Sequence, residues 1–87
     1  MKKINFERLE IFTNLEKTQC VVQDMKKDFS SIIYQLGVGI EAHALALKIF
    51  NSHGEVEYDE RECEIIGEMS KMCTPSFMDA ISKILGK

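Results

Sequence analysis

The chain has 87 residues, of which 45% are hydrophobic and 29% charged, and it carries a net charge of −3 at pH 7. These values exclude a disordered or low-complexity chain, and we expect residues 1–87 to form a single domain with a thin core. The negative balance disfavours nucleic acid as a partner, because Lys and Arg side chains supply most of the affinity for phosphates.

The cysteines, the N-terminal charges and the apolar segments bear on location. The three cysteines are odd in number and lack C-x-x-C spacing, which fits neither a disulfide framework nor a zinc knuckle and favours a reducing compartment. Charged residues interrupt the first twelve positions, where a signal peptide needs an apolar run. The most apolar segment, 36–50, contains charges and is shorter than the roughly 18 uncharged residues of a membrane span. We therefore expect a cytoplasmic protein without membrane contact.

The first predicted elements are a short helix or turn at 5–12 and a long helix from Thr13 to Leu36. Thr13 and Glu16 have the spacing of a capping box, which would start the long helix. Apolar residues then recur at alternating steps of three and four, which keeps one side of a helix apolar. This stripe consists of Leu15, Thr18, Val22, Met25, Phe29, Ile32 and Leu36. Such a helix would be about 36 Å long, longer than its neighbours can cover, so we expect a homodimer through it.

Two glycines, Gly37 and Gly39, follow this helix. Gly37 is expected to end it in the left-handed conformation, although a single bent helix stays open as the alternative. The segment from Ile40 to Phe50 is apolar almost all round and predicts a central buried helix. His43 lies on its apolar side, and we interpret it as a hydrogen-bonded core histidine rather than a metal ligand.

An acidic segment, "HGEVEYDERECEII", comes next and has six carboxylates between Glu55 and Glu64. Its first part alternates Val56 and Tyr58 with glutamates and predicts a very short extended segment. Asp59 with Glu62 then has the spacing of a second capping box, so the acidic residues are suited to starting a helix.

The same acidic segment could instead bind a calcium ion or a basic partner. A calcium loop of the EF-hand type is disfavoured, because Ile49 and His53 would stand at its first and fifth ligand positions. A docking face for a partner with a basic surface is favoured over calcium, since the carboxylates exceed what capping needs. The residues predicted to bind and orient this partner are Glu57, Glu60, Glu64 and Glu68.

The last two predicted helices meet at Thr74, which has the character of an N-cap and is followed by Pro75. Gly86 is expected to close the second of them. Two helices joined by a short turn have the outline of a helix-turn-helix, which makes a DNA-binding regulator the alternative function. The second helix nevertheless offers mainly small or acidic polar residues where base recognition needs Arg, Lys, Asn or Gln. These residues are Ser76, Asp79, Ser82 and Lys83.

These segments together predict an all-α fold, a bundle of three main helices, or four if the glycine break is real. The expected core is Val22, Met25, Phe29, Ile32, Leu47, Ile66, Met69 and Ile81.

No combination of residues predicts catalysis. Cys20 lies opposite the apolar stripe of the long helix, and no histidine or helix N-terminus near it in the sequence would activate its thiol. We expect no enzymatic activity and no cofactor. The function that remains is a non-enzymatic protein–protein interaction module, such as a small adaptor, inhibitor or regulatory subunit, which docks through the acidic helical surface.

Overall fold

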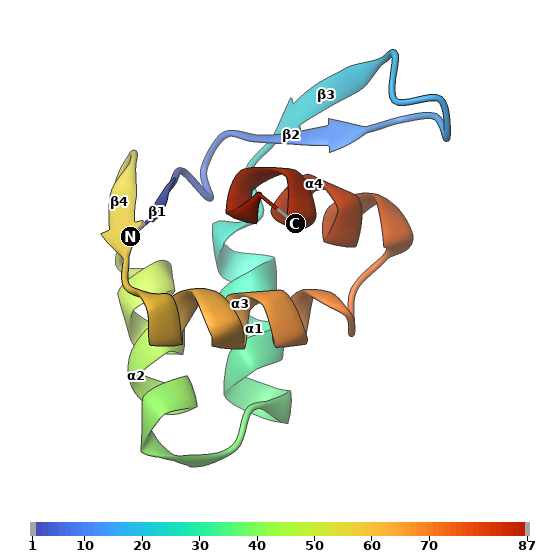
Figure 1. The fold of residues 1–87 in the computed structure, drawn as a ribbon. Helices are drawn as coiled ribbons and strands as arrows, with labels where there is room; N and C mark the ends of the chain where they lie inside the picture. The colour runs from blue at the N-terminus through green and yellow to red at the C-terminus, as the bar shows by residue number, and fades with distance from the viewer. Residues whose placement is uncertain (1, 87) are drawn as a thin grey trace.

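The computed structural model describes residues 2–86, which form an α+β fold, so the prediction of an all-α bundle is wrong (Figure 1). Helices and strands follow one another in the order β1 (Lys2–Ile4), β2 (Leu9–Phe12), β3 (Cys20–Gln23), α1 (Lys26–Leu36), α2 (Gly39–Phe50), β4 (Val56–Tyr58), α3 (Glu60–Ser70) and α4 (Pro75–Leu85). Among the described residues, no helix has the length and hydropathy needed to span a bilayer.

The predicted long helix is replaced over its first half by a β-hairpin. Strands β2 and β3 are antiparallel, with Phe12 opposite Cys20. The Asn14 side chain holds the connecting loop, since its Oδ1 accepts from the Thr18 backbone N–H at 3.1 Å and its Nδ2 donates to the Thr18 hydroxyl at 2.8 Å. Thr13 therefore lies in a hairpin and does not cap a helix. The apolar stripe predicted one helix because Leu15 and Thr18 of the hairpin loop and Val22 of β3 happen to continue the helical period of α1.

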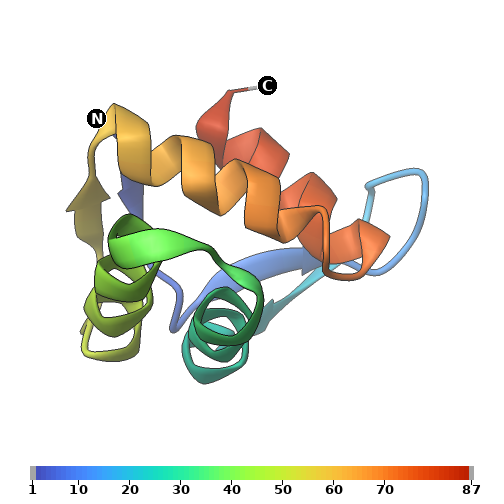
Figure 2. The same cartoon turned by 90° about the horizontal axis from the view of Figure 1, so that it is seen from below.

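Strand β4 confirms the predicted extended segment and pairs antiparallel with β1, with Lys2 opposite Tyr58 and Ile4 opposite Val56. This pairing brings the start of the chain beside its middle. Helices α1 and α2 lie side by side and extend away from both sheets, and α3 crosses near them while α4 lies under the hairpin (Figure 1, Figure 2).

The break between α1 and α2 is confirmed, but the two glycines act differently from the prediction. Gly39 takes the positive φ of 88°, whereas Gly37 is extended, with φ −71°. Gly37 is needed for space: a Cβ there would lie 2.5 Å from the Ile33 carbonyl oxygen and 2.7 Å from the Cβ of Ala42. The missing side chain thus allows α1 and α2 to approach each other.

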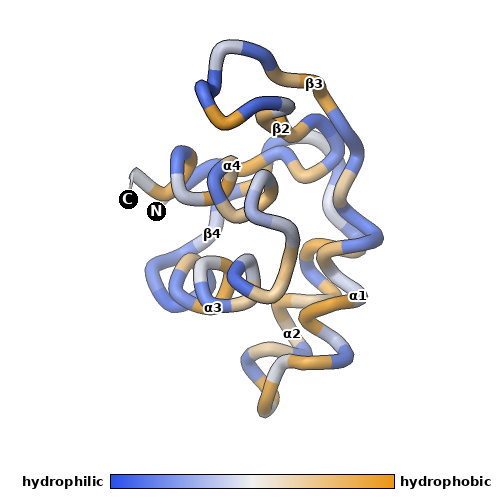
Figure 3. Tube along the Cα trace, turned by 90° about the vertical axis from the view of Figure 1, so that its right-hand side faces the viewer, coloured by the Kyte–Doolittle hydropathy of each residue, from blue (hydrophilic) through white to orange (hydrophobic). Residues whose placement is uncertain are grey.

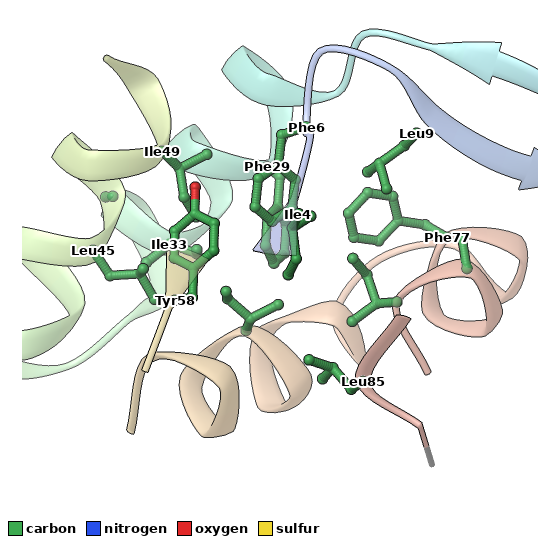
Figure 4. Close-up of a cluster of buried hydrophobic side chains, with 14 of the residues drawn as sticks. Ile4, Phe6, Leu9, Phe29, Ile33, Leu45, Ile49, Tyr58, Phe77 and Leu85 are labelled. Carbon is green, nitrogen blue, oxygen red and sulfur yellow. The ribbon is translucent and has the colours of Figure 1, made fainter. Parts of the chain in front are cut away.

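The core is built around aromatic rings from four separate segments (Figure 4). Phe6 stacks on Phe29 with ring centroids 5.4 Å apart and meets the edge of Tyr58 at 5.7 Å, while Phe77 lies 4.9 Å from Phe29. Of the expected core residues, three are fully buried as predicted: Phe29, Ile66 and Ile81. Met25, Ile32 and Met69 are partly buried, whereas Val22 and Leu47 are exposed, which corrects the prediction for those two.

An ionic cluster ties the N-terminal segment to two others. The buried Lys26 ammonium lies 2.9 Å from a Glu7 carboxylate oxygen and donates to the Ser52 carbonyl at 3.0 Å. The other Glu7 oxygen accepts from the Gly54 N–H at 2.7 Å. The Gly54 N–H and the Lys26 ammonium together hold the pKa of Glu7 below the ordinary value of a glutamate.

Substituting Gly37→Ala should lower the free energy of unfolding by about 1–3 kcal/mol, because the added methyl group meets backbone and a short side chain that cannot swing away. The matched control is Gly67→Ala inside α3, where the new Cβ meets only a Leu85 methyl at 3.5 Å. That variant should be more stable by about 0.5–1 kcal/mol, as alanine is preferred over glycine in a helix. Urea unfolding of both variants measures this, and equal effects would contradict the close approach at Gly37.

Substituting Glu7→Gln should destabilise the protein at neutral pH but not in acid. Because the folded pKa of Glu7 is lowered, its contribution is fully present above the unfolded value of about 4.3 and is lost as pH falls through the folded pKa. The difference between variant and wild type, measured by urea unfolding over a pH series, should therefore shrink on acidification. The exposed Glu10, for which residues 2–86 provide no ion pair, supplies the control Glu10→Gln. A pH-independent difference would exclude the ionic contribution.

Candidate interaction surfaces

The acidic segment does start a helix, as predicted. The Asp59 side chain accepts from the Glu62 backbone N–H at 2.7 Å, and Glu62 accepts from the Asp59 N–H at 2.9 Å, which completes the capping box. Glu62 also binds the Lys48 ammonium of α2 at 2.9 Å. Two of the six carboxylates, Asp59 and Glu62, thus serve the capping box.

The four predicted partner-binding glutamates are all exposed, but they do not form one site. Glu57 lies on β4 and Glu60 at the start of α3, whereas Glu64 and Glu68 lie one turn apart farther along α3. Glu64 is 3.0 Å from the Arg61 guanidinium, and Glu68 is 3.4 Å from the Lys71 ammonium. Exposed pairs of this kind are worth at most about 1 kcal/mol, so a partner cation can replace the internal one.

Arg61 connects α3 with α2. Its guanidinium lies 3.0 Å from both Glu41 and Glu64, and these hydrogen bonds hold its pKa above the usual value. One cation is thus shared between two carboxylates, which leaves excess negative charge on this side of the molecule.

Glu64 and Glu68 border a groove of about 530 Å³ between α3, α4 and the α1–α2 loop. Buried or half-buried apolar side chains line its inner part, among them Ile65, Met69 and Met78. The end of α1 and the loop form another wall with two exposed apolar residues, Leu36 (53% exposed) and Val38 (92% exposed). Arg61, Lys71 and the carboxylates of Glu41, Glu64 and Glu68 complete the lining. The pattern in the sequence could place Glu64 near Glu68, but not this loop beside them.

A second surface corrects the prediction that the segment from Ile40 to Phe50 forms a central buried helix. Ile40, Leu47 and Phe50 of α2 are exposed, and His43, expected in the core, is exposed as well. The His43 ring lies 5.8 Å from the ring of Tyr34 on α1. Figure 3 shows hydrophobic positions, interspersed with hydrophilic ones, along the α1–α2 hairpin. This helix pair therefore presents an apolar face to solvent.

The remaining candidates from the sequence are the cysteines and the helix-turn-helix. Cys20 is exposed, and it lies on strand β3 and not on the predicted long helix. Burial raises the pKa of the Cys63 and Cys73 thiols, which makes them poorer nucleophiles. Helix α4 packs against both α3 and β2 (Figure 2). The Lys83 ammonium lies 5.4 Å from the centre of the Phe12 ring. A recognition helix covered by a hairpin in this way is poorly placed to enter a DNA groove.

Within residues 2–86, no three His, Cys, Asp or Glu side chains are grouped so that they could hold a metal ion. Comparisons with protein-family models, curated proteins and solved structures gave no significant match.

Substituting Asp59→Ala should lower the free energy of unfolding by about 1 kcal/mol, because the Glu62 N–H loses its acceptor. Asp59→Asn is the matched control, since an asparagine oxygen caps a helix about as well without the charge. Urea unfolding of the two variants separates the effects. An equal loss in both would assign the stabilisation to the negative charge at the helix N-terminus and not to the cap.

Proposed function

We propose that this protein is a non-enzymatic protein–protein interaction module, a small adaptor, inhibitor or regulatory subunit, that binds an amphipathic helix of another protein in the groove between α3, α4 and the α1–α2 loop. The groove is the observation that supports this function, because it combines an open apolar interior with a charged border. A cytoplasmic location is part of the proposal and is supported by the odd number of cysteines.

The groove suits a helix in size and chemistry. Helix α3, which forms one side, has 11 residues and is about 16 Å long, or roughly three turns of a bound helix. A partner helix would place apolar residues at i, i+3/i+4 and i+7 against Ile65, Met69 and Met78. Such contacts with half-buried side chains provide affinity through the removal of apolar surface from water.

The charges indicate which helix fits. The lining contains three carboxylates against two cations, Arg61 and Lys71, and the whole chain carries −3. Lys or Arg residues beside the apolar stripe of the partner would bind Glu64 and Glu68 directly. Glu57 and Glu60 lie outside the groove and would act at longer range, by increasing the rate of association with a basic partner.

The experiment is to recover partners of a tagged copy from its native cell and compare them with those of the variant Glu64→Lys/Glu68→Lys. The reversal places two cations where the basic helix should bind, so a stoichiometric protein partner should be lost and its association rate should fall at least about tenfold. Both positions are exposed, so the fold should persist, which circular dichroism checks.

The matched control is Glu10→Lys/Glu16→Lys, which changes the net charge equally but on the hairpin, outside the groove. It should retain the partner. If both variants lose the partner equally, the loss comes from the change in net charge and not from the groove. If both variants retain the partner, the groove is not its binding site. Recovery of DNA with a shared sequence, with binding that falls steeply with salt, would favour the helix-turn-helix instead.

A further inference from the structure

The outer side of α2 carries a stripe without charge. Ile40 (86% exposed), Leu47 (47% exposed) and Phe50 (49% exposed) follow at steps that keep them on one side of the helix, and the exposed His43 and Ala44 lie between them. None of the residues in this stripe is Asp, Glu, Lys or Arg.

The charged residues of α2 do not interrupt the stripe. Glu41 is held by Arg61 at 3.0 Å and Lys48 by Glu62 at 2.9 Å, so both side chains are directed toward α3. On the opposite border, a groove of about 220 Å³ separates α2 from α1 and is lined by Tyr34, Leu47, Phe50 and other residues that carry no charge. The α1–α2 face thus offers an uncharged apolar ridge beside an uncharged groove.

We propose that a second copy of this chain covers this face, with the two α2 helices antiparallel about a two-fold axis. A charged partner gains no electrostatic attraction on an uncharged surface. A second copy, in contrast, carries −3 itself and would meet repulsion on the acidic side of the molecule. The α2 face is where two copies can meet without bringing carboxylates together.

The order of residues along the stripe fits this arrangement. If the axis passes between His43 and Ala44, Ile40 of one copy faces Leu47 of the other, so that large residues meet large ones at both ends. The small Ala44 at the centre allows the two helices to approach to the usual 8–10 Å. Phe50 then lies near the α1–α2 loop of the second copy, and the two helical hairpins together form an antiparallel four-helix bundle.

The size of the face sets the expected affinity. Helix α2 is about 18 Å long, and two neighbouring helices are about 20 Å wide, so the face covers roughly 400 Å² in projection. This is less than the roughly 800 Å² per partner of a standard interface, and we expect a weak dimer with a micromolar or higher dissociation constant. The predicted homodimer through a helix over residues 13–36 is different and loses its basis, since that helix does not exist.

Sedimentation equilibrium of the whole chain up to millimolar concentration tests the proposal. The wild-type mass should rise from 10.0 kDa toward twice that value. Leu47→Glu alone and Ile40→Lys alone should each weaken the dimer at least about tenfold, because each buries an unpaired charge. The double variant Ile40→Lys/Leu47→Glu should regain association in low salt, because each lysine then faces a glutamate of the other copy.

Three control variants make the result specific. Ile40→Glu/Leu47→Glu should stay monomeric, since it places like charges opposite each other. Leu15→Glu, at a 97% exposed apolar position of the hairpin, should dimerise like the wild type. Glu64→Lys/Glu68→Lys should also dimerise normally, so this proposal and the proposed partner groove can fail separately.

A monomeric wild type at all concentrations would overturn the proposal. So would a dimer that survives Leu47→Glu, or a double variant that does not regain association although circular dichroism shows it folded.

Discussion

Two consecutive residues, Phe6 and Glu7, hold the separate parts of this small domain together. The Phe6 ring is fully buried against Phe29 of α1 and Tyr58 of β4, and its carbonyl oxygen accepts from the Met25 N–H at 2.8 Å, directly before α1. Glu7 then binds across to α1 and to the loop after α2. The irregular segment that contains Phe6 and Glu7 therefore passes through the centre of the molecule. Each neighbouring helix packs one of its faces against this segment.

A core centred on one segment can cover only one side of each helix. In α2 the buried residues are Ala42, Leu45, Ala46 and Ile49, which lie on a single face, and nothing in residues 2–86 covers the other. Since a chain of this length buries only about 60–65% of its unfolded surface, apolar side chains remain outside. The uncharged α2 face and the groove beside α3 both follow from this limit, which is why we interpret them as contact surfaces.

Local signals in the sequence were sufficient for the second half of the fold. The Asp59 capping box and the Thr74 N-cap act within three residues, and Gly86 ends α4 with φ 76° as expected. The first half could not be predicted in this way. Whether residues 9–23 form a helix or a hairpin depends on the loop that Asn14 holds and on packing against α4, and strand β1 finds its partner more than fifty residues away. Strand pairing between residues this far apart in the chain produces no periodic pattern in the sequence.

The candidate surfaces also combine local contacts, which the sequence predicts, with contacts between distant segments, which it does not. Glu64 and Glu68 are one turn apart, so a helix alone brings them together. Val38 reaches the same groove only because Gly37 lets α2 turn back against α1. That loop also lies near Phe50 of the second copy in the proposed dimer. Because the axis relates the two copies, such a dimer would present two identical grooves. Two weak helix-binding sites on one dimer bind a partner with several binding helices far more tightly than one site does. Weak self-association would therefore increase the affinity for such a partner without any new contact to it.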